Sequence, residues 1–228
     1  MLYKVISTGS KGNCVVINDK IAIDLGISYR KLGDYKKTIK LVFLTHQHTD
    51  HFNWDTVRLL AHNHPTVKFA CMDYMVNSLK KIVPPKNIYI LKPDTKYDLG
   101  ICQAAAFDLE HDVPNCGWRL FIEGKKIVYA TDTRSLNIEA QDYDYYFIEG
   151  NYDYETTLKR YREKKEKGEY AYELRAMSNH LSIDQFKEFI AKNNVKGEVI
   201  MMHQHEDKDE IEEKQSLRPD AESEEDSI

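Results

Sequence analysis

The sequence predicts one α/β domain, and three observations support this fold class. Short apolar runs with strand character alternate with helix-like segments along the whole chain. No internal repeat of about 20 to 50 residues is visible. The 228 residues are 42% hydrophobic and 30% charged, and no apolar run is longer than a strand. We therefore expect a packed core in a single domain and no transmembrane segment.

The chain is expected to begin with three closely spaced strands and a helix. The strands fall over residues 2–6, 14–17 and 21–24 because these runs are apolar or alternate, and Asn18 and Asp19 supply turn residues between the last two. A helix is expected over residues 28–35. Strands and helices then alternate, and we expect strands at 40–44, 67–70 and 87–91 with helices at 54–62 and 74–82.

The second half opens with strands at 101–107, 118–122 and 127–130. Glu123 and Gly124 join the last two as a hairpin, because such a tight turn needs glycine. Two more strands are expected at 145–149 and 198–202. The Ser-x-x-Gln spacing of Ser182 and Gln185 predicts a capping box that opens a helix to about Asn193. The charged segment 156–173 reads as either a solvated helix or a functional arm.

The charge of the chain is unevenly distributed. Residues 206–228 hold eleven acidic and three basic residues, a net charge of −8, whereas the whole chain carries −5. We expect one folded domain at 1–205 and a disordered or loosely attached acidic tail at 206–228. The tail is either a solvated end or an autoinhibitory strip.

The chain's start and its cysteines indicate a compartment. The residues after Met1 lack the basic start and long apolar stretch of a secretory signal, so we expect a cytoplasmic protein. The four cysteines form no Cys-x-x-Cys pair, which favours buried thiols over a zinc ribbon or a disulfide framework. They are Cys14, Cys71, Cys102 and Cys116.

The strongest chemical signal is a histidine-rich segment directly after the expected strand at 40–44. It reads Thr45-His46-Gln47-His48-Thr49-Asp50-His51. His46 and His48 lie two apart where the strand becomes a loop, so both imidazoles can point to one side and share a metal ion. Asp50 and His51 follow at the next turn and can reach a second ion.

Three further polar residues each follow an expected strand and are candidate metal ligands. His111 comes after the strand through Phe107, Asp132 after the strand at 127–130, and His203 after the strand at 198–202. His205 is an alternative to His203, because the run reads His203-Gln204-His205. Imidazole and carboxylate ligands of this kind accept zinc, manganese or iron.

These motifs resemble the metallo-β-lactamase superfamily of metallohydrolases, over nearly the whole chain before the tail. The resemblance implies a four-layer αββα sandwich with two divalent metal ions at one edge of the sheets, and we expect these ions to be zinc. It also implies that His46, His48 and His111 hold the first ion, that Asp50, His51 and His203 hold the second, and that Asp132 bridges them.

Within that superfamily the chain is most similar to ribonuclease Z and the WalJ/YycJ-type nucleases. The similarity rests on Gly9-Ser10-Lys11-Gly12-Asn13-Cys14, Ile23-Asp24-Leu25-Gly26, His111-Asp112-Val113-Pro114, Thr131-Asp132-Thr133, Glu149-Gly150-Asn151-Tyr152-Asp153 and Asn179-His180-Leu181-Ser182. It implies that Glu149 and His180 together supply a proton to the leaving group. Asp50 would orient the attacking water while also binding metal.

The sequence therefore predicts a dinuclear metal-dependent phosphodiesterase, in the form of a nuclease acting on DNA or RNA. The alternatives are a hydrolase of small substrates, such as cyclic nucleotides or thioesters, and a metal-bound scaffold without turnover. A nucleic acid or nucleotide substrate needs a cationic surface, and the candidates are Lys159, Arg160, Arg162, Lys164 and Lys165. We expect no membrane partner, and the sequence leaves monomer and homodimer open.

Overall fold

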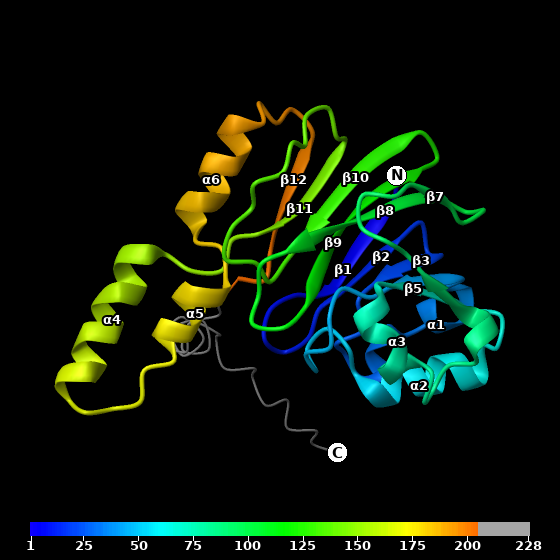
Figure 1. The fold of residues 1–228 in the computed structure, drawn as a ribbon, viewed down its shortest axis with the longest axis horizontal. Helices are drawn as coiled ribbons and strands as arrows, with labels where there is room; N and C mark the ends of the chain where they lie inside the picture. Colours follow the sequence, from blue (N-terminus) through cyan, green and yellow to red (C-terminus); the bar gives the residue numbers. More distant parts are fainter. Residues whose placement is uncertain (205–228) are drawn as a thin grey trace, which may run out of the picture.

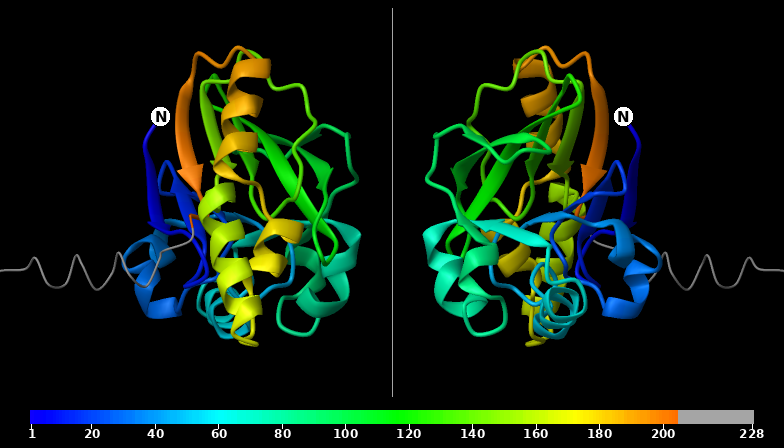
Figure 2. Two further views of the ribbon diagram at one scale, coloured as in Figure 1. Left: turned by 90° about the vertical axis from the view of Figure 1, so that its left-hand side faces the viewer. Right: turned by 90° about the vertical axis from the view of Figure 1, so that its right-hand side faces the viewer.

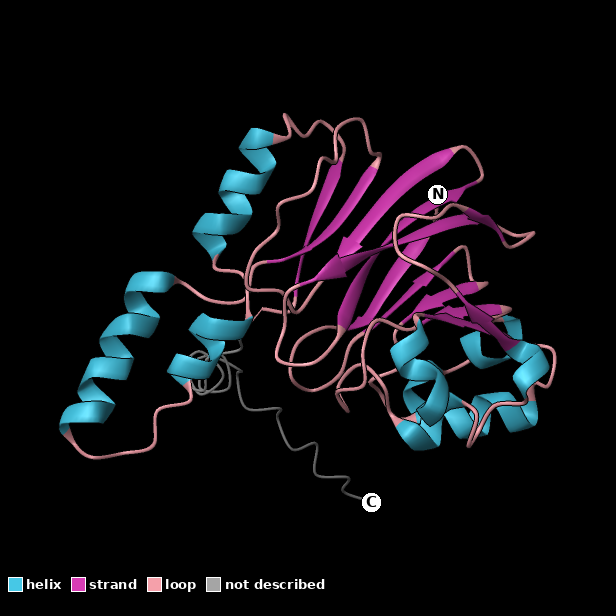
Figure 3. Ribbon diagram, in the orientation of Figure 1, coloured by secondary structure: helices cyan, strands magenta, loops and turns pink. Residues whose placement is uncertain are grey.

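Two six-stranded sheets pack face to face, and helices lie on their outer sides, in a computed structural model that describes residues 1–204 (Figures 1 and 3). The expected four-layer αββα fold is confirmed. The predictions for His205 and for the tail at 206–228 lie outside the described residues. Among the residues described, no helix has both the length and the apolar character needed to cross a bilayer.

The first sheet contains the strands of the N-terminal half in chain order. They are β1 (Tyr3–Ser7), β2 (Cys14–Ile17), β3 (Ile21–Ile23), β4 (Leu41–Phe43), β5 (Lys68–Cys71) and β6 (Ile88–Ile90). Strands β1, β2 and β3 pair antiparallel, whereas β3 to β6 pair in parallel. Because β3 and β4 are parallel, both carboxyl ends reach the same edge of the sheet.

The second sheet mirrors this arrangement in the C-terminal half. Its strands are β7 (Tyr97–Asp98), β8 (Gln103–Leu109), β9 (Asn115–Ile122), β10 (Lys125–Ala130), β11 (Tyr145–Glu149) and β12 (Glu198–Met202). Strands β7 to β10 pair antiparallel, and β10, β11 and β12 pair in parallel with Ala130 opposite Ile148 and Ile148 opposite Met201. The residues that follow these three strands therefore emerge side by side.

The helices divide between the two outer faces (Figure 2). On the first sheet lie η1 (Tyr29–Leu32), α1 (Tyr35–Thr38), α2 (Trp54–Asn63), α3 (Asp73–Leu79) and η2 (Pro85–Asn87). The helices on the side of the second sheet are α4 (Tyr154–Glu166), α5 (Glu173–Asn179) and α6 (Ile183–Lys192). In Figure 1, α6 runs along β11 and β12, whereas α4 projects away from the sheets beside α5.

Apolar residues form three clusters that separate the four layers. One lies between the first sheet and its helices, one between the two sheets, and one between the second sheet and α6. In the central cluster the rings of Phe43 and Trp118, one from each sheet, lie 4.9 Å apart. All four cysteines are buried and free, as the sequence predicts.

Most of the expected elements are present, but the short elements η2, β7 and α5 were not predicted, and one expected helix is divided. The expected helix at 28–35 is two short elements, η1 and α1, because Gly33 has a positive φ of 55° and ends the first. The segment 156–173 contains a helix, α4, but the following α5 was not predicted. The hairpin turn at Glu123 and Gly124 is confirmed, with φ of 49° and 78°.

Candidate metal centre

The segment 45–51 leaves the end of β4 as a loop that neighbouring turns hold against the sheet. The backbone N–H of Asn13 donates to the carbonyl oxygen of Asp50 at 2.6 Å, and that of Leu25 donates to the carbonyl oxygen of His51. A Cβ at Gly26 would lie 1.7 Å from the carbonyl oxygen of Asp50. The glycine and asparagine motifs noted in the sequence thus fit tightly against the backbone of the histidine-rich segment.

A first group of three imidazoles comes from this loop and from the residues that follow β8. His46, His48 and His111 each offer a ligand atom, and these atoms lie within 4.8 Å of one another. Nε2 of His111 lies 3.2 Å from Nδ1 of His48. Nε2 of His46 is buried and has no hydrogen-bond partner among the described residues.

A second group lies beside the first and shares the carboxylate of Asp132 with it. Asp50, His51 and His203 again place ligand atoms within 4.8 Å of one another. One oxygen of Asp132 lies 2.8 Å from Nε2 of His51, and the other lies 3.4 Å from Nε2 of His203 and 4.0 Å from Nε2 of His111. Asp132 therefore lies between the two groups.

This donor set fits a divalent metal centre. Buried polar atoms normally have hydrogen-bond partners, yet Nε2 of His46 and Nε2 of His203 are buried without one among the described residues. Imidazole nitrogens and carboxylate oxygens are the ligands that zinc and related ions prefer. The structure brings all seven sequence-predicted ligands together, and their assignment to individual ions stays a prediction.

Each of the five histidines also has a polar neighbour at its other ring nitrogen. Such contacts fix the tautomer and orientation of metal-binding imidazoles. The pairs are His46 Nδ1 with Thr45 Oγ1 (3.0 Å), His48 Nε2 with Asp112 Oδ1 (3.3 Å), His51 Nδ1 with Asp24 Oδ2 (2.7 Å), His111 Nδ1 with the Asn179 carbonyl oxygen (3.0 Å), and His203 Nδ1 with Glu149 Oε1 (3.4 Å).

Sequence reasoning gave no role to Asp24, which holds His51. This carboxylate is fully buried directly after β3 and accepts hydrogen bonds from the backbone N–H and the hydroxyl of Thr45. Tyr129 donates to it at 3.4 Å. A signal existed, because Asp24 follows an apolar strand just as Asp132 does.

Electrostatics separates the two groups of histidines. Burial lowers the pKa of His51, but the negative charges of Asp132 and Asp24 and their hydrogen bonds outweigh it and raise this pKa to about 10. Burial acts in the same direction on His203, whose pKa is nevertheless raised by Asp132, Asp50 and Glu149. Burial and neighbouring imidazoles hold the pKa of His46 well below its usual 6.5.

Glu149 and His180 form a hydrogen-bonded pair at the edge of this cluster. Nδ1 of His180 lies 2.6 Å from Oε1 of Glu149, which is fully buried at the end of β11. The other carboxylate oxygen accepts the backbone N–H of Thr133 at 2.9 Å. Burial lowers the pKa of His180, but Glu149 and Asp132 outweigh it and raise the pKa above 6.5. The pair leaves Nε2 of His180 as the nitrogen available to a ligand.

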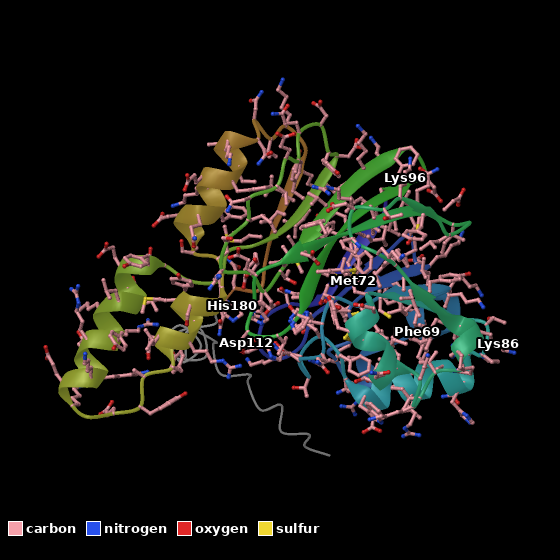
Figure 4. The ribbon with its side chains drawn as sticks, viewed as in Figure 1. Phe69, Met72, Lys86, Lys96, Asp112 and His180 are labelled. Carbon is pink, nitrogen blue, oxygen red and sulfur yellow. The ribbon has the colours of Figure 1, made fainter. Side chains whose placement is uncertain are left out.

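A pocket of about 490 Å³ opens over the cluster. His180, at the end of α5, and Asp112, beyond β8, mark its position in Figure 4. Its lining consists of Ser10, Gln47, His48, Thr49, Asp50, His111, Asp132, Asn151, Tyr172, Arg175, Ala176, His180, His203 and Gln204. The pocket therefore gives a ligand access to the candidate metal ligands and to His180 together.

The five candidate nucleic-acid contacts all lie on α4, and none of them lines this pocket. Lys164 forms an ion pair with Glu173 of α5, and its Nζ lies 4.1 Å above the ring of Tyr172. Lys159 lies 3.9 Å from Glu163 on the exposed surface. Helix α4 thus places basic side chains beside the pocket but outside its lining, and the ion pair of Lys164 with Glu173 connects α4 to α5.

A family model described as a beta-lactamase superfamily domain matches residues 28–204. No protein in the curated set of sequences matches the chain. Three solved structures share its fold at 15% identity each: the metallo-beta-lactamase fold protein YhfI from Bacillus subtilis, the short form of human tRNase Z (ELAC1), and a diphosphatase of the PhnP family. Their TM-scores are 0.68, 0.66 and 0.59, and the alignments cover 92%, 90% and 96% of this chain and 90%, 92% and 91% of theirs. At this identity the likeness shows the fold alone.

Proposed function

The chain belongs to the beta-lactamase superfamily and is a metal-dependent hydrolase of that family, and we propose that it hydrolyses the phosphodiester bonds of nucleic acid. The observation that carries the proposal is the Glu149–His180 pair, in which His180 lines the pocket and the buried Glu149 lies behind it, beside the candidate metal ligands. Such a pair suits a leaving group that needs a proton, as the sugar oxygen of a nucleotide does.

In the proposed enzyme the two groups of ligands would hold two divalent ions. His46, His48 and His111 would hold one ion and Asp50, His51 and His203 the other, and the carboxylate of Asp132 lies close to both groups. When bound, two such ions lower the pKa of a water molecule and stabilise charge on a phosphoryl group. Zinc fits this nitrogen-rich donor set, and manganese or iron would also be accepted.

The chain's own residues then divide the proton transfers. Asp50 is partly exposed in the pocket, so its carboxylate can orient the attacking water and accept its proton. Glu149 binds Nδ1 of His180, which directs Nε2–H toward the departing oxygen. Negative neighbours favour the protonated form of His180, which is the form that a general acid needs.

One observation favours a nucleic acid over a small substrate. The pocket is flanked by α4, whose Lys159, Arg160, Arg162 and Lys165 can attract a phosphate backbone. Two proteins of similar fold are named as a tRNase and a diphosphatase, which agrees with phosphate chemistry for either kind of substrate.

The test compares His180→Ala with the wild-type chain on two substrates. With bis(p-nitrophenyl) phosphate the leaving group departs without a proton, whereas a nucleotide needs one. We expect His180→Ala to lose about 10²- to 10⁴-fold in turnover of single-stranded DNA or RNA but far less on the small diester. His48→Ala, which loses a metal ligand, should abolish both activities.

The other outcomes separate the competing functions. Wild-type turnover confined to small diesters, cyclic nucleotides or thioesters would replace the nuclease with a small-substrate hydrolase. Metal binding without any turnover would indicate a scaffold. If α4 attracts the polymer, Lys159→Glu should weaken binding and its salt dependence, and equal binding by this variant would exclude α4 as a contact surface.

A further inference from the structure

The wall of the pocket formed by the start of α5 differs in chemistry from the other walls. Arg175 is the one lysine or arginine among the described residues that line the pocket, and Tyr172 is the one tyrosine, phenylalanine or tryptophan. The two residues are three positions apart at the first turn of α5, so they lie on one face of the helix. One permanent cation and one large aromatic ring therefore lie together in the pocket that contains the candidate metal ligands.

Arg175 is fixed next to the first group of histidines. Its Nη2 donates to Oδ2 of Asp112 at 2.8 Å, and the other oxygen of Asp112 lies 3.3 Å from Nε2 of His48. The side chain of Arg175 is nevertheless 66% exposed. A guanidinium carries five N–H donors, so the contact with Asp112 orients the group while leaving other donors for an anion in the pocket.

Tyr172 is held from the side of α4. Glu173, the next residue, is 1% exposed and forms an ion pair with Lys164, whose Nζ lies 4.1 Å above the Tyr172 ring. Tyr172 is 40% exposed and lines the pocket. Lys164 is therefore better described as a positioning residue for this wall than as a direct phosphate contact.

We propose that Tyr172 and Arg175 form a subsite for the nucleotide next to the scissile phosphodiester, with its base stacked on Tyr172 and its phosphate bound by Arg175. A nucleotide offers an aromatic face and an anion in one unit, the two chemistries that this wall presents. The inference rests on the proposed function, because it names how a nucleic acid substrate would be held.

The test measures binding of a labelled single-stranded phosphorothioate oligonucleotide, which resists hydrolysis, to the full-length zinc-loaded chain by fluorescence anisotropy. Tyr172→Ala should raise Kd about tenfold, whereas Tyr172→Phe, which keeps the ring, should not. Arg175→Ala should reduce the slope of log Kd against log salt by about 0.7, the value for one phosphate contact on a single strand. Arg175→Lys should restore that slope.

Matched controls come from residues outside the pocket. Tyr170→Ala removes a more exposed tyrosine two positions away, and Arg58→Ala removes an arginine that also pairs with one carboxylate, on α2. Both should leave Kd and the salt slope unchanged. A purely structural effect of Arg175→Ala would raise Kd without changing the salt slope.

The outcomes separate this inference from the proposed function. An unchanged Kd for Tyr172→Ala, or an unchanged salt slope for Arg175→Ala, in a chain that cleaves nucleic acid would overturn the subsite alone. A wild-type chain that hydrolyses bis(p-nitrophenyl) phosphate but neither binds nor cleaves oligonucleotides would overturn nucleic acid as the substrate and the subsite with it.

Discussion

Replacing Asp24 by asparagine should weaken metal binding although Asp24 is not itself a candidate ligand. Its Oδ1 accepts the backbone N–H of Thr45 at 2.9 Å, and its Oδ2 lies 2.7 Å from Nδ1 of His51. In Asp24→Asn the amide oxygen keeps the contact with Thr45, so the amide nitrogen faces His51. Nδ1 of His51 must then accept a hydrogen bond, and the ring proton moves to Nε2, the nitrogen aimed at Asp132.

The expected loss of metal affinity follows from the hydrogen bond that Asp24→Asn removes. Asp24 and His51 are both fully buried, so water cannot replace the lost charge-assisted hydrogen bond. Loss of such a supporting contact typically costs 10- to 100-fold in metal affinity, or about 1.4 to 2.7 kcal/mol. We expect this loss at the group of Asp50, His51 and His203, which we propose binds one ion, and a smaller loss at the group of His46, His48 and His111.

The assay is a zinc titration of metal-free protein in competition with a chromogenic chelator, which resolves the affinities of the two ions. The backbone at Asp24 has φ of 57°, which asparagine tolerates well, so the fold should be kept. Tyr129→Phe is the matched control, since it removes a 3.4 Å hydrogen bond to the same carboxylate but no charge. Wild-type affinity for both ions in Asp24→Asn would refute the assigned role of Asp24.

Two further predictions concern the same loop and the same histidines. Gly26→Ala should destabilise the fold by about 1 to 3 kcal/mol or more and weaken zinc binding, because the new Cβ would collide with the carbonyl of Asp50. Gly33→Ala is the control, because no atom lies within 4 Å of the new Cβ. It should lower the free energy of unfolding by about 1 to 2 kcal/mol, since Gly33 has a positive φ, and leave zinc binding unchanged. Thermal unfolding and zinc titration check both variants, and equal zinc affinity in Gly26→Ala would contradict the steric argument. Zinc binding at pH 7 should release about two protons, because the raised pKa values keep His51 and His203 protonated in the metal-free chain, whereas an imidazole must be neutral to bind zinc. The affinity for zinc should therefore rise as the pH is raised toward the pKa of His51, about 10. Calorimetry in buffers of different ionisation enthalpy measures the release, and binding without proton release would show that both imidazoles are already neutral.

The sequence alone predicted the features that depend on short spacing. The motif from His46 to His51 directly follows a strand, so its side chains must emerge together at one edge of a sheet. The capping box of Ser182 and Gln185 is confirmed with both of its hydrogen bonds. These features lie within six residues of one another, where local backbone geometry decides the outcome.

Short helices illustrate the limit of local patterns. Most of the seven residues of α5 favour a helix, but a helix this short is not stable on its own and depends on tertiary packing. Its first turn is held by the ion pair of Glu173 with Lys164, nine positions away on α4. The sequence showed the charge of Lys164 but not that the neighbouring helix uses it.

The tertiary structure decided which distant side chains meet. Asp24 and His51 lie 27 positions apart, and Glu149 and His180 lie 31 apart. Resemblance to a family indicated the second pair, but residue types and spacing could not place either one. Parallel pairing brings the ends of β3 and β4 to one edge and those of β10, β11 and β12 to the edge of the facing sheet, so Asp24, Asp132, Glu149 and His203 emerge around the histidine-rich loop. The sequence by itself determined the candidate metal ligands, and strand register, which depends on packing between remote segments, determined which partners they meet.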